Sequence, residues 1–173
     1  SRRFVEELDY RREAAWLRRL APIYAARGVA VPKPMGRLSG ARVLTMTRMP
    51  GVSLRVWLQC GRNRSVRRAV AASVLDAWMF GVLRHGVIHA DPSIGNVFVA
   101  GQGEVGFVDF GSAMDLPAPL LSLLRTLVGH PENARRVDLR NQFRALGVSV
   151  DARTYRELVV PMAAWFAGPF HAG

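Results

Sequence analysis

Apolar residues recur at helical spacing over several long stretches of the chain. The spacing predicts an amphipathic helix over 3–27 that ends before Gly28, with Pro22 as a candidate break. Between 65 and 85 the apolar positions cover more than one stripe, which is typical of a central helix buried on most sides. Further helices are predicted over 120–128, over about 131–146, and after Asp151, where Pro161 is a candidate kink.

Shorter stretches have the composition of strands. Residues 29–36 and 42–49, separated by a Ser-Gly turn signal, predict a hairpin of extended segments. Apolar runs at 97–100 and 104–108, joined through two glycines, predict a second strand pair. The pattern as a whole predicts an α+β chain dominated by helices.

The positive charge of the chain is compatible with several kinds of anionic partner and does not distinguish among them. The net charge is +11 and the pI about 11.5, and Lys33 is the only lysine among 24 basic residues. A positive surface suits nucleotide phosphate, anionic lipid or nucleic acid. The arginines are scattered through helical segments without a nucleic-acid-binding motif, so we expect no nucleic-acid partner. Arginines between 125 and 144 are the candidates for contact with an anionic membrane surface.

The sequence disfavours a protein held by disulfides or several thiolate metal ligands, a membrane-spanning protein and a secreted one. Cys60 is the only cysteine, which excludes an internal disulfide and a site with several thiolate ligands. No apolar run reaches the roughly 18 residues that a spanning helix needs. The first residues are charged, unlike a signal peptide. We therefore expect a cytoplasmic chain, either soluble or peripheral to a membrane.

Three oxygen-bearing side chains follow the central helix in the order of a phosphoryl-transfer site. Asn96 is the fifth residue after Asp91 in the loop, and Asp109 begins an Asp-Phe-Gly sequence after the strand pair. Protein kinases place a catalytic Asp and a metal-binding Asn at this spacing, followed by a second metal-binding Asp in that tripeptide. Asp91 would accept the proton of the attacking hydroxyl, and Asn96 and Asp109 would hold Mg²⁺ against phosphate oxygens. The pattern predicts catalytic roles for all three.

Several motifs occur in the order found in one kinase family. The sequence H-A-D-P-S-I-G-N at 89–96 resembles the H-A-D-P-H-P-G-N loop of the UbiB (AarF-like) atypical kinases, and E-L-D-Y-R-R-E-A at 7–14 is similar to that family's E-L-D-Y/F-x-x-E-A helix. Val-Pro at 31–32, Met-Pro-Gly at 49–51 and Val-Asp-Phe-Gly at 108–111 follow the same order. The resemblance covers about residues 4–115.

The resemblance implies a protein-kinase-like fold with ATP and Mg²⁺ as cofactors. Residues 1–52 would form part of the N-lobe, comprising the αC-like helix, a short remnant of the sheet and the hinge, and 53–173 the helical C-lobe with its catalytic loop. Family members are associated with ubiquinone and other isoprenoid-lipid metabolism, so lipid-biosynthesis enzymes are expected partners; the oligomeric state stays open. The residues implied in cofactor binding are Glu7, which would pair with the phosphate-binding lysine, Glu13 as a secondary site residue, and Met46, Thr47 and Met49 beside adenine.

The chain departs from the family pattern at several positions. Ser93-Ile94 replaces His-Pro, Trp16 replaces an asparagine, and Thr47 replaces a hinge glutamate. The family's phosphate loop, phosphate-binding lysine and K-x-G-Q helix would all precede residue 1. The expectation is therefore a fragment or processed product in which these 173 residues alone bind Mg·ATP weakly or not at all.

Three other functions remain open from the sequence. One is a pseudokinase or scaffold that organises a lipid-enzyme complex, and another is an aminoglycoside- or choline-type phosphotransferase, whose catalytic loop is closely similar. The E-L-D-Y-R-R-E-A element argues against the second. An arginine-rich nucleic-acid binder is the least favoured, because no motif supports it.

Overall fold

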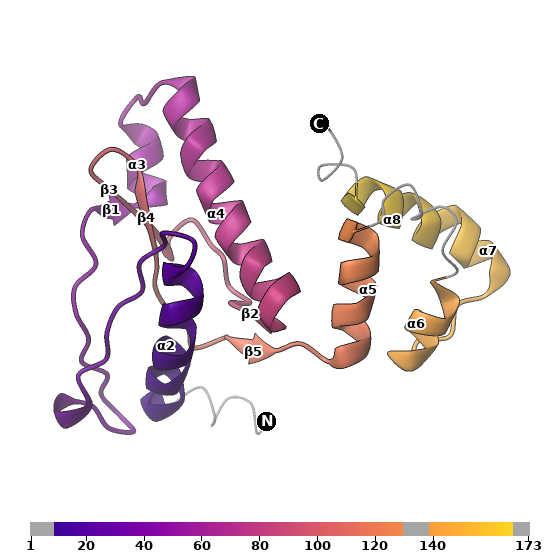
Figure 1. The fold of residues 1–173 in the computed structure, drawn as a ribbon, viewed down its shortest axis with the longest axis horizontal. Coiled ribbons are helices and arrows are strands. Elements are labelled where there is room, and N and C mark those ends of the chain that lie inside the picture. The colour runs from indigo at the N-terminus through magenta and orange to yellow at the C-terminus, as the bar shows by residue number, and fades with distance from the viewer. Residues whose placement is uncertain (1–8, 130–138, 168–173) are drawn as a thin grey trace. The chain divides into compact units, whose positions relative to one another are not determined.

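A computed structural model describes residues 9–129 and 139–167 (Figure 1). It combines helices with small antiparallel sheets, so the α+β class is confirmed. The chain divides into two compact units, Ser1–Asp115 and Leu116–Gly173. This division differs from the lobe boundary expected after residue 52, which stays a prediction.

Helix α2 spans Tyr10–Ala25 and carries the E-A end of the motif at 7–14. The carboxylate of Asp9 caps it by accepting a hydrogen bond from the amide of Arg11 at 3.0 Å. One face of the helix packs into the core through Ala14, Leu17, Leu20 and Tyr24. Pro22 does not break the helix, which continues through it to Ala25 and ends within the same turn.

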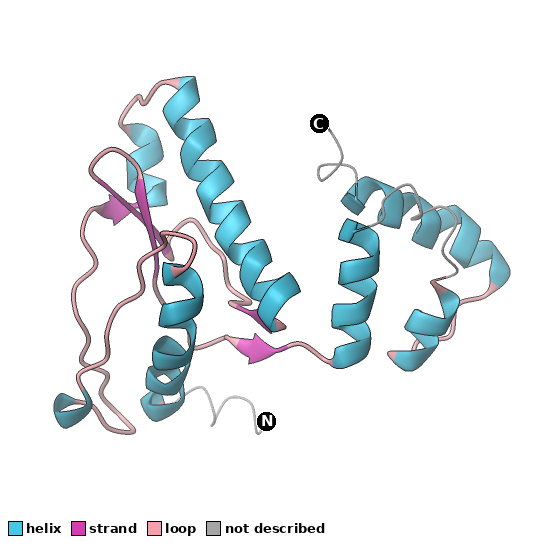
Figure 2. Ribbon diagram, in the orientation of Figure 1, coloured by secondary structure: helices cyan, strands magenta, loops and turns pink. Residues whose placement is uncertain are grey.

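The hairpin expected over 29–36 and 42–49 forms only in part (Figure 2). The two segments run antiparallel but meet in a single bridge between Pro34 and Met46, without regular strands. Two prolines in the first segment lack the backbone amides that a strand ladder needs, so a regular hairpin does not form. A short helical turn, η1 (Gly36–Leu38), connects the segments.

Two helices precede the loop at 89–96. Helix α3 spans Leu54–Gln59, and the long helix α4 spans Arg64–His85, as the apolar pattern predicts. Asn63 caps α4 through a bond from the amide of Val66 at 2.9 Å. Gly86, in the left-handed conformation with φ of 67°, ends it.

The predicted strand pair at 97–108 is confirmed as β3 (Val97–Ala100) and β4 (Glu104–Phe107), and β1 (Val52–Ser53) pairs with the other side of β3 to give a three-stranded sheet of order β1-β3-β4. The segment after α2 adds to the edge of β4 at Ala30, which is bridged to Gly106 in parallel. A separate two-stranded sheet pairs β2 with β5. The strands are β1 (Val52–Ser53), β2 (Val87–Ile88), β3 (Val97–Ala100), β4 (Glu104–Phe107) and β5 (Met114–Asp115).

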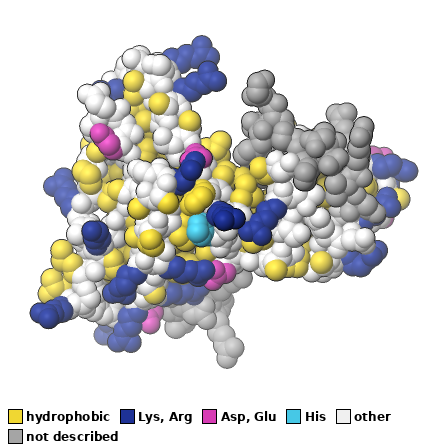
Figure 3. Space-filling view, viewed as in Figure 1, with side chains coloured by type: hydrophobic (Ala, Val, Ile, Leu, Met, Phe, Trp, Pro, Cys, Tyr) yellow, Lys and Arg dark blue, Asp and Glu magenta, His cyan; other side chains and the backbone are white. Residues whose placement is uncertain are grey.

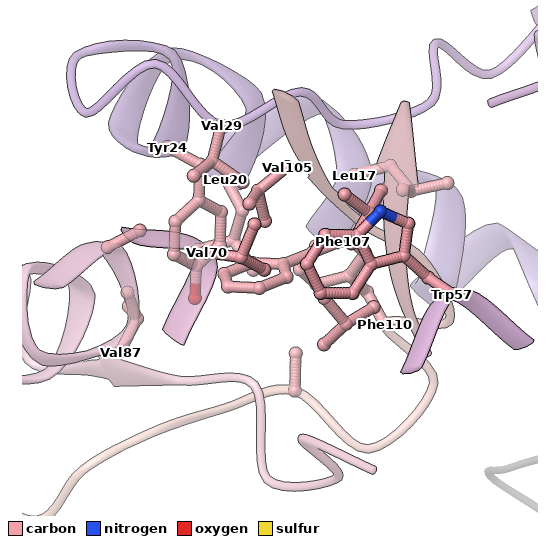
Figure 4. Close-up of a cluster of buried hydrophobic side chains, with 14 residues drawn as sticks. Leu17, Leu20, Tyr24, Val29, Trp57, Val70, Val87, Val105, Phe107 and Phe110 are labelled. Atoms are coloured by element: carbon pink, nitrogen blue, oxygen red, sulfur yellow. The ribbon is translucent and has the colours of Figure 1, made fainter. Parts of the chain in front are cut away.

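The core of the first unit joins α2 to the sheet and to the Asp-Phe-Gly loop (Figure 4). The ring of Tyr24 meets Phe107 edge-on, with centroids 5.0 Å apart, and lies 6.0 Å from Phe110. Phe110 is fully buried. Because the side chain after Asp109 is anchored in the core, the backbone at Asp109 is held in a fixed place.

The second unit is helical: α5 (Ala118–Gly129), α6 (Arg140–Ala145), α7 (Ala152–Thr154), the π-helical turn η3 (Tyr155–Val159) and α8 (Val160–Ala167). The hydroxyl of Tyr155, in its core, accepts a hydrogen bond from the amide of Leu139 at 2.9 Å. A kink was expected at Pro161, and the helix is irregular there: the π-helical turn η3 ends two residues before the proline, which cannot donate to the helix ladder. Among the described residues no helix is long and apolar enough to cross a bilayer.

Candidate active site

Asp91 and Asn96 are joined directly by a hydrogen bond within the loop that follows β2. The amide nitrogen of Asn96, Nδ2, donates to Oδ2 of Asp91 at 2.9 Å and to its backbone oxygen at 3.2 Å. This pairing uses the donor end of the Asn96 side chain, so its carbonyl oxygen is left for another ligand. Both side chains have access to solvent.

Asp109 is brought to the same region by an extension of the β3–β4 ladder. The amide of Val108 donates to the backbone oxygen of Asn96 at 2.9 Å, so Asp109 follows directly beside that residue. Its carboxylate oxygen Oδ1 accepts a bond from the amide of Gly111 at 3.3 Å. The three predicted catalytic side chains therefore lie on adjoining segments.

Two residues in these segments have an unusual backbone. Ala90 and Asp109 have φ of 61° and 60°, and they are the non-glycine residues with positive φ in the described part of the chain. Left-handed backbone costs about 1–2 kcal/mol for a residue with a Cβ, and it gathers at functional sites. One precedes Asp91 and the other is the candidate metal ligand itself.

His89 connects the segment of Asp91 to the segment of Asp109 from the buried side. Its side chain is 2% exposed, and Nε2 lies 3.0 Å from the backbone oxygen of Val108. The ring packs against Phe110, with centroids 4.5 Å apart. Burial lowers the pKa of His89, which favours a neutral ring with the proton assigned to Nε2. Nδ1 is buried and has no hydrogen-bond partner among the residues that the structure describes.

Glu13 reaches the same loop from α2, 97 residues earlier in the chain. Its Oε1 accepts a hydrogen bond from the amide of Phe110 at 3.3 Å. Burial, and then the charge of Asp109, raise the pKa of Glu13. The secondary site residue implied by the family resemblance thus contacts the Asp-Phe-Gly backbone.

An open cavity of about 700 Å³, called the cleft below, lies between α2, the segment at 42–46 and the Asp-Phe-Gly loop. Its walls combine apolar and polar groups. Of the residues expected beside adenine, Met46 lines it, whereas Thr47 and Met49 do not. The lining residues are Tyr10, Glu13, Arg42, Val43, Leu44, Met46, Val108, Asp109, Gly111 and Ser112.

Thr47 and Met49 have other surroundings. The hydroxyl oxygen of Thr47 accepts a hydrogen bond from the amide of Lys33 at 2.9 Å, which holds the two extended segments together. Met49 is buried with 8% exposure. The side chains of both residues therefore contact the fold, and their expected place beside adenine stays a prediction. Glu7 lies outside the described residues.

The oxygen donors suit a magnesium ion that shares its ligands with a substrate. Asp109 offers an exposed carboxylate, and Asn96 offers the carbonyl oxygen that its bond to Asp91 leaves free. Within the described ranges, no three His, Cys, Asp or Glu side chains gather closely enough to hold a metal alone. Mg²⁺ in nucleotide sites takes one or two protein ligands together with phosphate and water oxygens.

Arg42, His89 and Ser112 also neighbour the site, although the sequence pattern did not predict them there. For His89, its place two residues before Asp91 inside the quoted loop motif was a usable signal. For Ser112, adjacency to Asp-Phe-Gly was the only one. Arg42 had none, because it is one of many arginines and its position depends on the turn that precedes it.

Comparison with known proteins gives a family and relatives. The model of the ABC1 atypical kinase-like domain matches residues 1–130. The uncharacterized protein Rv0647c of Mycobacterium tuberculosis is 32% identical over 134 residues, which cover 72% of this chain and 26% of that protein. The chloroplastic protein ACTIVITY OF BC1 COMPLEX KINASE 1 of Arabidopsis thaliana is 27% identical over 152 residues, covering 84% and 21%. The chain spans about a quarter of the length of these relatives.

A solved structure shares the fold. The complex structure of Rv3197 with erythromycin, from Mycobacterium tuberculosis, superposes with a TM-score of 0.60 and 23% sequence identity. The match covers 90% of this chain and 42% of the other. The kinase-like fold class expected from the sequence is confirmed by this likeness.

Proposed function

Because this chain belongs to the ABC1 atypical kinase-like family, the UbiB/AarF type indicated by its motifs, we propose that it forms the catalytic-loop part of an ATP-dependent phosphotransferase. The observation that carries the proposal is the bond between Asn96 and Asp91, on a segment hydrogen-bonded to the residue before Asp109. This arrangement supports the proposal, because it would hold the proposed proton acceptor and metal ligands together before a substrate arrives.

Asp91 is the proposed proton acceptor. The bond from Asn96 Nδ2 occupies Oδ2 of Asp91 and fixes the plane of the carboxylate. Its other oxygen can accept the proton of an attacking hydroxyl, which is a poor nucleophile while protonated. The positive φ at Ala90 sets the direction in which this side chain leaves the loop.

Asn96 and Asp109 are the proposed magnesium ligands. The ion would neutralise charge on the transferring phosphoryl group. Glu13 fixes the loop that carries Asp109 by accepting from the amide of Phe110, and the buried ring of Phe110 anchors the same loop in the core. The protein's contribution at this end of the cleft is to hold the ligand oxygens still.

The apolar part of the cleft is the proposed nucleotide base site. Met46, Leu44 and Val108 supply apolar surface beside the Asp109 end. A flat aromatic base is bound mainly by such surface with a few polar contacts, as in most small-molecule sites. Adenine would therefore lie along the extended segment, with its phosphates toward Asp109.

An apolar groove beside the catalytic loop supports a lipid-like acceptor. The groove has a volume of about 420 Å³, lies between α3 and α4, and reaches Pro92, which directly follows Asp91. Figure 3 shows hydrophobic side chains emerging between arginines on the face that carries α4. Trp57, Val74 and Trp78 are among its lining residues. We propose a hydroxylated isoprenoid or related lipid as the acceptor, in keeping with the family's link to ubiquinone metabolism.

The test is the rate of ATP turnover by the complete gene product and its Asp91→Asn variant. Loss of the proton acceptor should lower kcat by roughly 100-fold or more while leaving ATP affinity nearly unchanged. Ser93→Ala, in the same exposed loop, is the matched control and should keep the wild-type rate. Equal rates in Asp91→Asn and wild type would rule out this role and favour a scaffold.

A further inference from the structure

We infer that Arg42 is a phosphate-binding residue of the cleft, contacting the phosphate chain of the nucleotide whose site is proposed above. Arg42 lines the cavity together with Glu13 and Asp109, and it is the cation among the lining residues. The inference rests on the proposed function, because it names a further contact of the same site. It adds a positive group from the extended segment opposite the acidic loop.

Arg42 is held at the cleft by its backbone. The amide of Tyr10 donates to the oxygen of Ala41 at 3.0 Å, which attaches this turn to the first residue of α2. The amide of Gly40 donates to the oxygen of Val43 at 2.8 Å and closes the turn around Arg42. Both neighbours of Arg42 are thus fixed, while its own side chain is exposed to solvent.

The guanidinium of Arg42 is free to take a ligand. It makes no ion pair or hydrogen bond with any of the described residues. Other arginines of this unit behave differently: Arg19 is bound to Asp115 through two nitrogens, and Arg27 is bound in the same way to Asp76. Arg42 keeps its donor fork open although two carboxylates line the same cavity.

The charges of the cleft explain why a cation is needed there. Glu13 and Asp109 both line the cavity, and the negative charge of two carboxylates there opposes an entering polyphosphate. A magnesium ion offsets this at Asp109. A guanidinium opposite the metal would bind phosphate oxygens that the ion does not reach, in the bidentate geometry that arginine favours.

The experiment compares ligands with and without phosphates on the complete gene product. Affinities for Mg·ATP, Mg·ADP and adenosine are measured by calorimetry for wild type, Arg42→Ala, Arg42→Lys and Arg48→Ala. Arg48 is the matched control, since it lies exposed on the same extended segment but does not line the cavity. Arg42→Ala should weaken Mg·ATP by roughly 5- to 20-fold, leave adenosine unchanged, and be partly restored in Arg42→Lys.

The outcomes separate this inference from the proposed function. If wild type binds Mg·ATP and Arg42→Ala binds it equally well, Arg42 is not a phosphate ligand and the proposed function stands. If Arg42→Ala weakens adenosine as much as ATP, the residue acts on the fold of the cleft and the inference fails. If wild type binds none of the three ligands, the proposed function itself fails. An equal loss in Arg48→Ala would assign the effect to general surface charge and overturn the inference.

Discussion

Nε2 of His89 lies 3.0 Å from the backbone oxygen of Val108, and this contact ties the segment carrying Asp91 to the segment carrying Asp109. The donor comes two residues before one catalytic candidate, and the acceptor comes one residue before the other. Because His89 is buried against Phe107 and Phe110, the contact is shielded from water. The relative position of the two carboxylates therefore depends on a buried imidazole in the core.

The stability of the protein should fall in acid through His89. The pKa of His89 is lowered by burial, so below its ordinary value of 6.5 the unfolded chain binds a proton that the folded chain does not. The contribution of the neutral ring is complete above that value and is lost as the pH falls through the depressed pKa, by at most about 1.4 kcal/mol per pH unit. Urea denaturation at about pH 7.5 and about pH 5.5 measures it.

Two variants isolate this effect. His89→Gln keeps a side-chain donor but cannot be protonated, so its free energy of unfolding should change less between the two pH values than that of wild type. His85→Gln, at the exposed end of α4, should behave like wild type. Identical pH dependence in wild type and His89→Gln would show that the buried ring is not the titrating group.

Glu13→Gln should fold as the wild type does and have a slightly higher free energy of unfolding at neutral pH. Because the pKa of Glu13 is raised, its ionisation opposes folding, and the stability present below its ordinary value of 4.5 is lost as the pH rises through the raised pKa. Glutamine removes that charge and can still accept from the amide of Phe110. The gain should be roughly 0.5 kcal/mol, since solvent screens a half-buried group.

The comparison for Glu13 is Glu104→Gln, an exposed position in β4. This variant should have the unfolding free energy of wild type in the same urea titration. If Glu13→Gln were instead clearly less stable than wild type, the carboxylate charge would be a net support for the Asp-Phe-Gly backbone. The repulsion from Asp109 would then be the smaller effect.

Gly51→Ala should be far more damaging than Gly61→Ala. Both glycines have positive φ, 83° and 63°. A Cβ at position 51 would overlap the backbone carbonyl of Val99 on β3, whereas a Cβ at 61 would meet open space. Gly61→Ala should cost about 1–2 kcal/mol from the backbone conformation alone, and Gly51→Ala about 3 kcal/mol or more because β1 must also move. Equal midpoints in thermal unfolding would contradict the close approach.

Local patterns in the sequence were enough to predict the long helix α4 and the strand pair β3–β4, but not the short helix α3. The apolar residues of 65–85 form α4 nearly as expected, and the spacing of Asp91 and Asn96 brought them into contact. The hairpin predicted at 29–49 forms as two extended segments with a single bridge, because Pro32 and Pro34 have no amide to donate to a longer ladder.

Contacts between distant segments could not be derived from local patterns. The bond from the amide of Phe110 to Glu13 joins residues from α2 and the loop after β4, and only the family resemblance pointed to Glu13. Arg42 reaches the cleft through a turn fixed by the first residue of α2, which no periodicity encodes. The side chains of Thr47 and Met49 contact the fold, and the place of this segment beside adenine, expected from the family resemblance, stays a prediction.

The most direct test of a shared site for Asp91, Asn96 and Asp109 is calorimetric titration of ATP with and without Mg²⁺. The complete gene product is compared with its Asn96→Ala, Asp109→Asn and Glu104→Gln variants. Wild type and Glu104→Gln should bind ATP about tenfold or more tightly when Mg²⁺ is present, and the other two should lose most of that gain. An Mg²⁺ effect of the same size in Asp109→Asn and wild type, or none in wild type, would contradict the account.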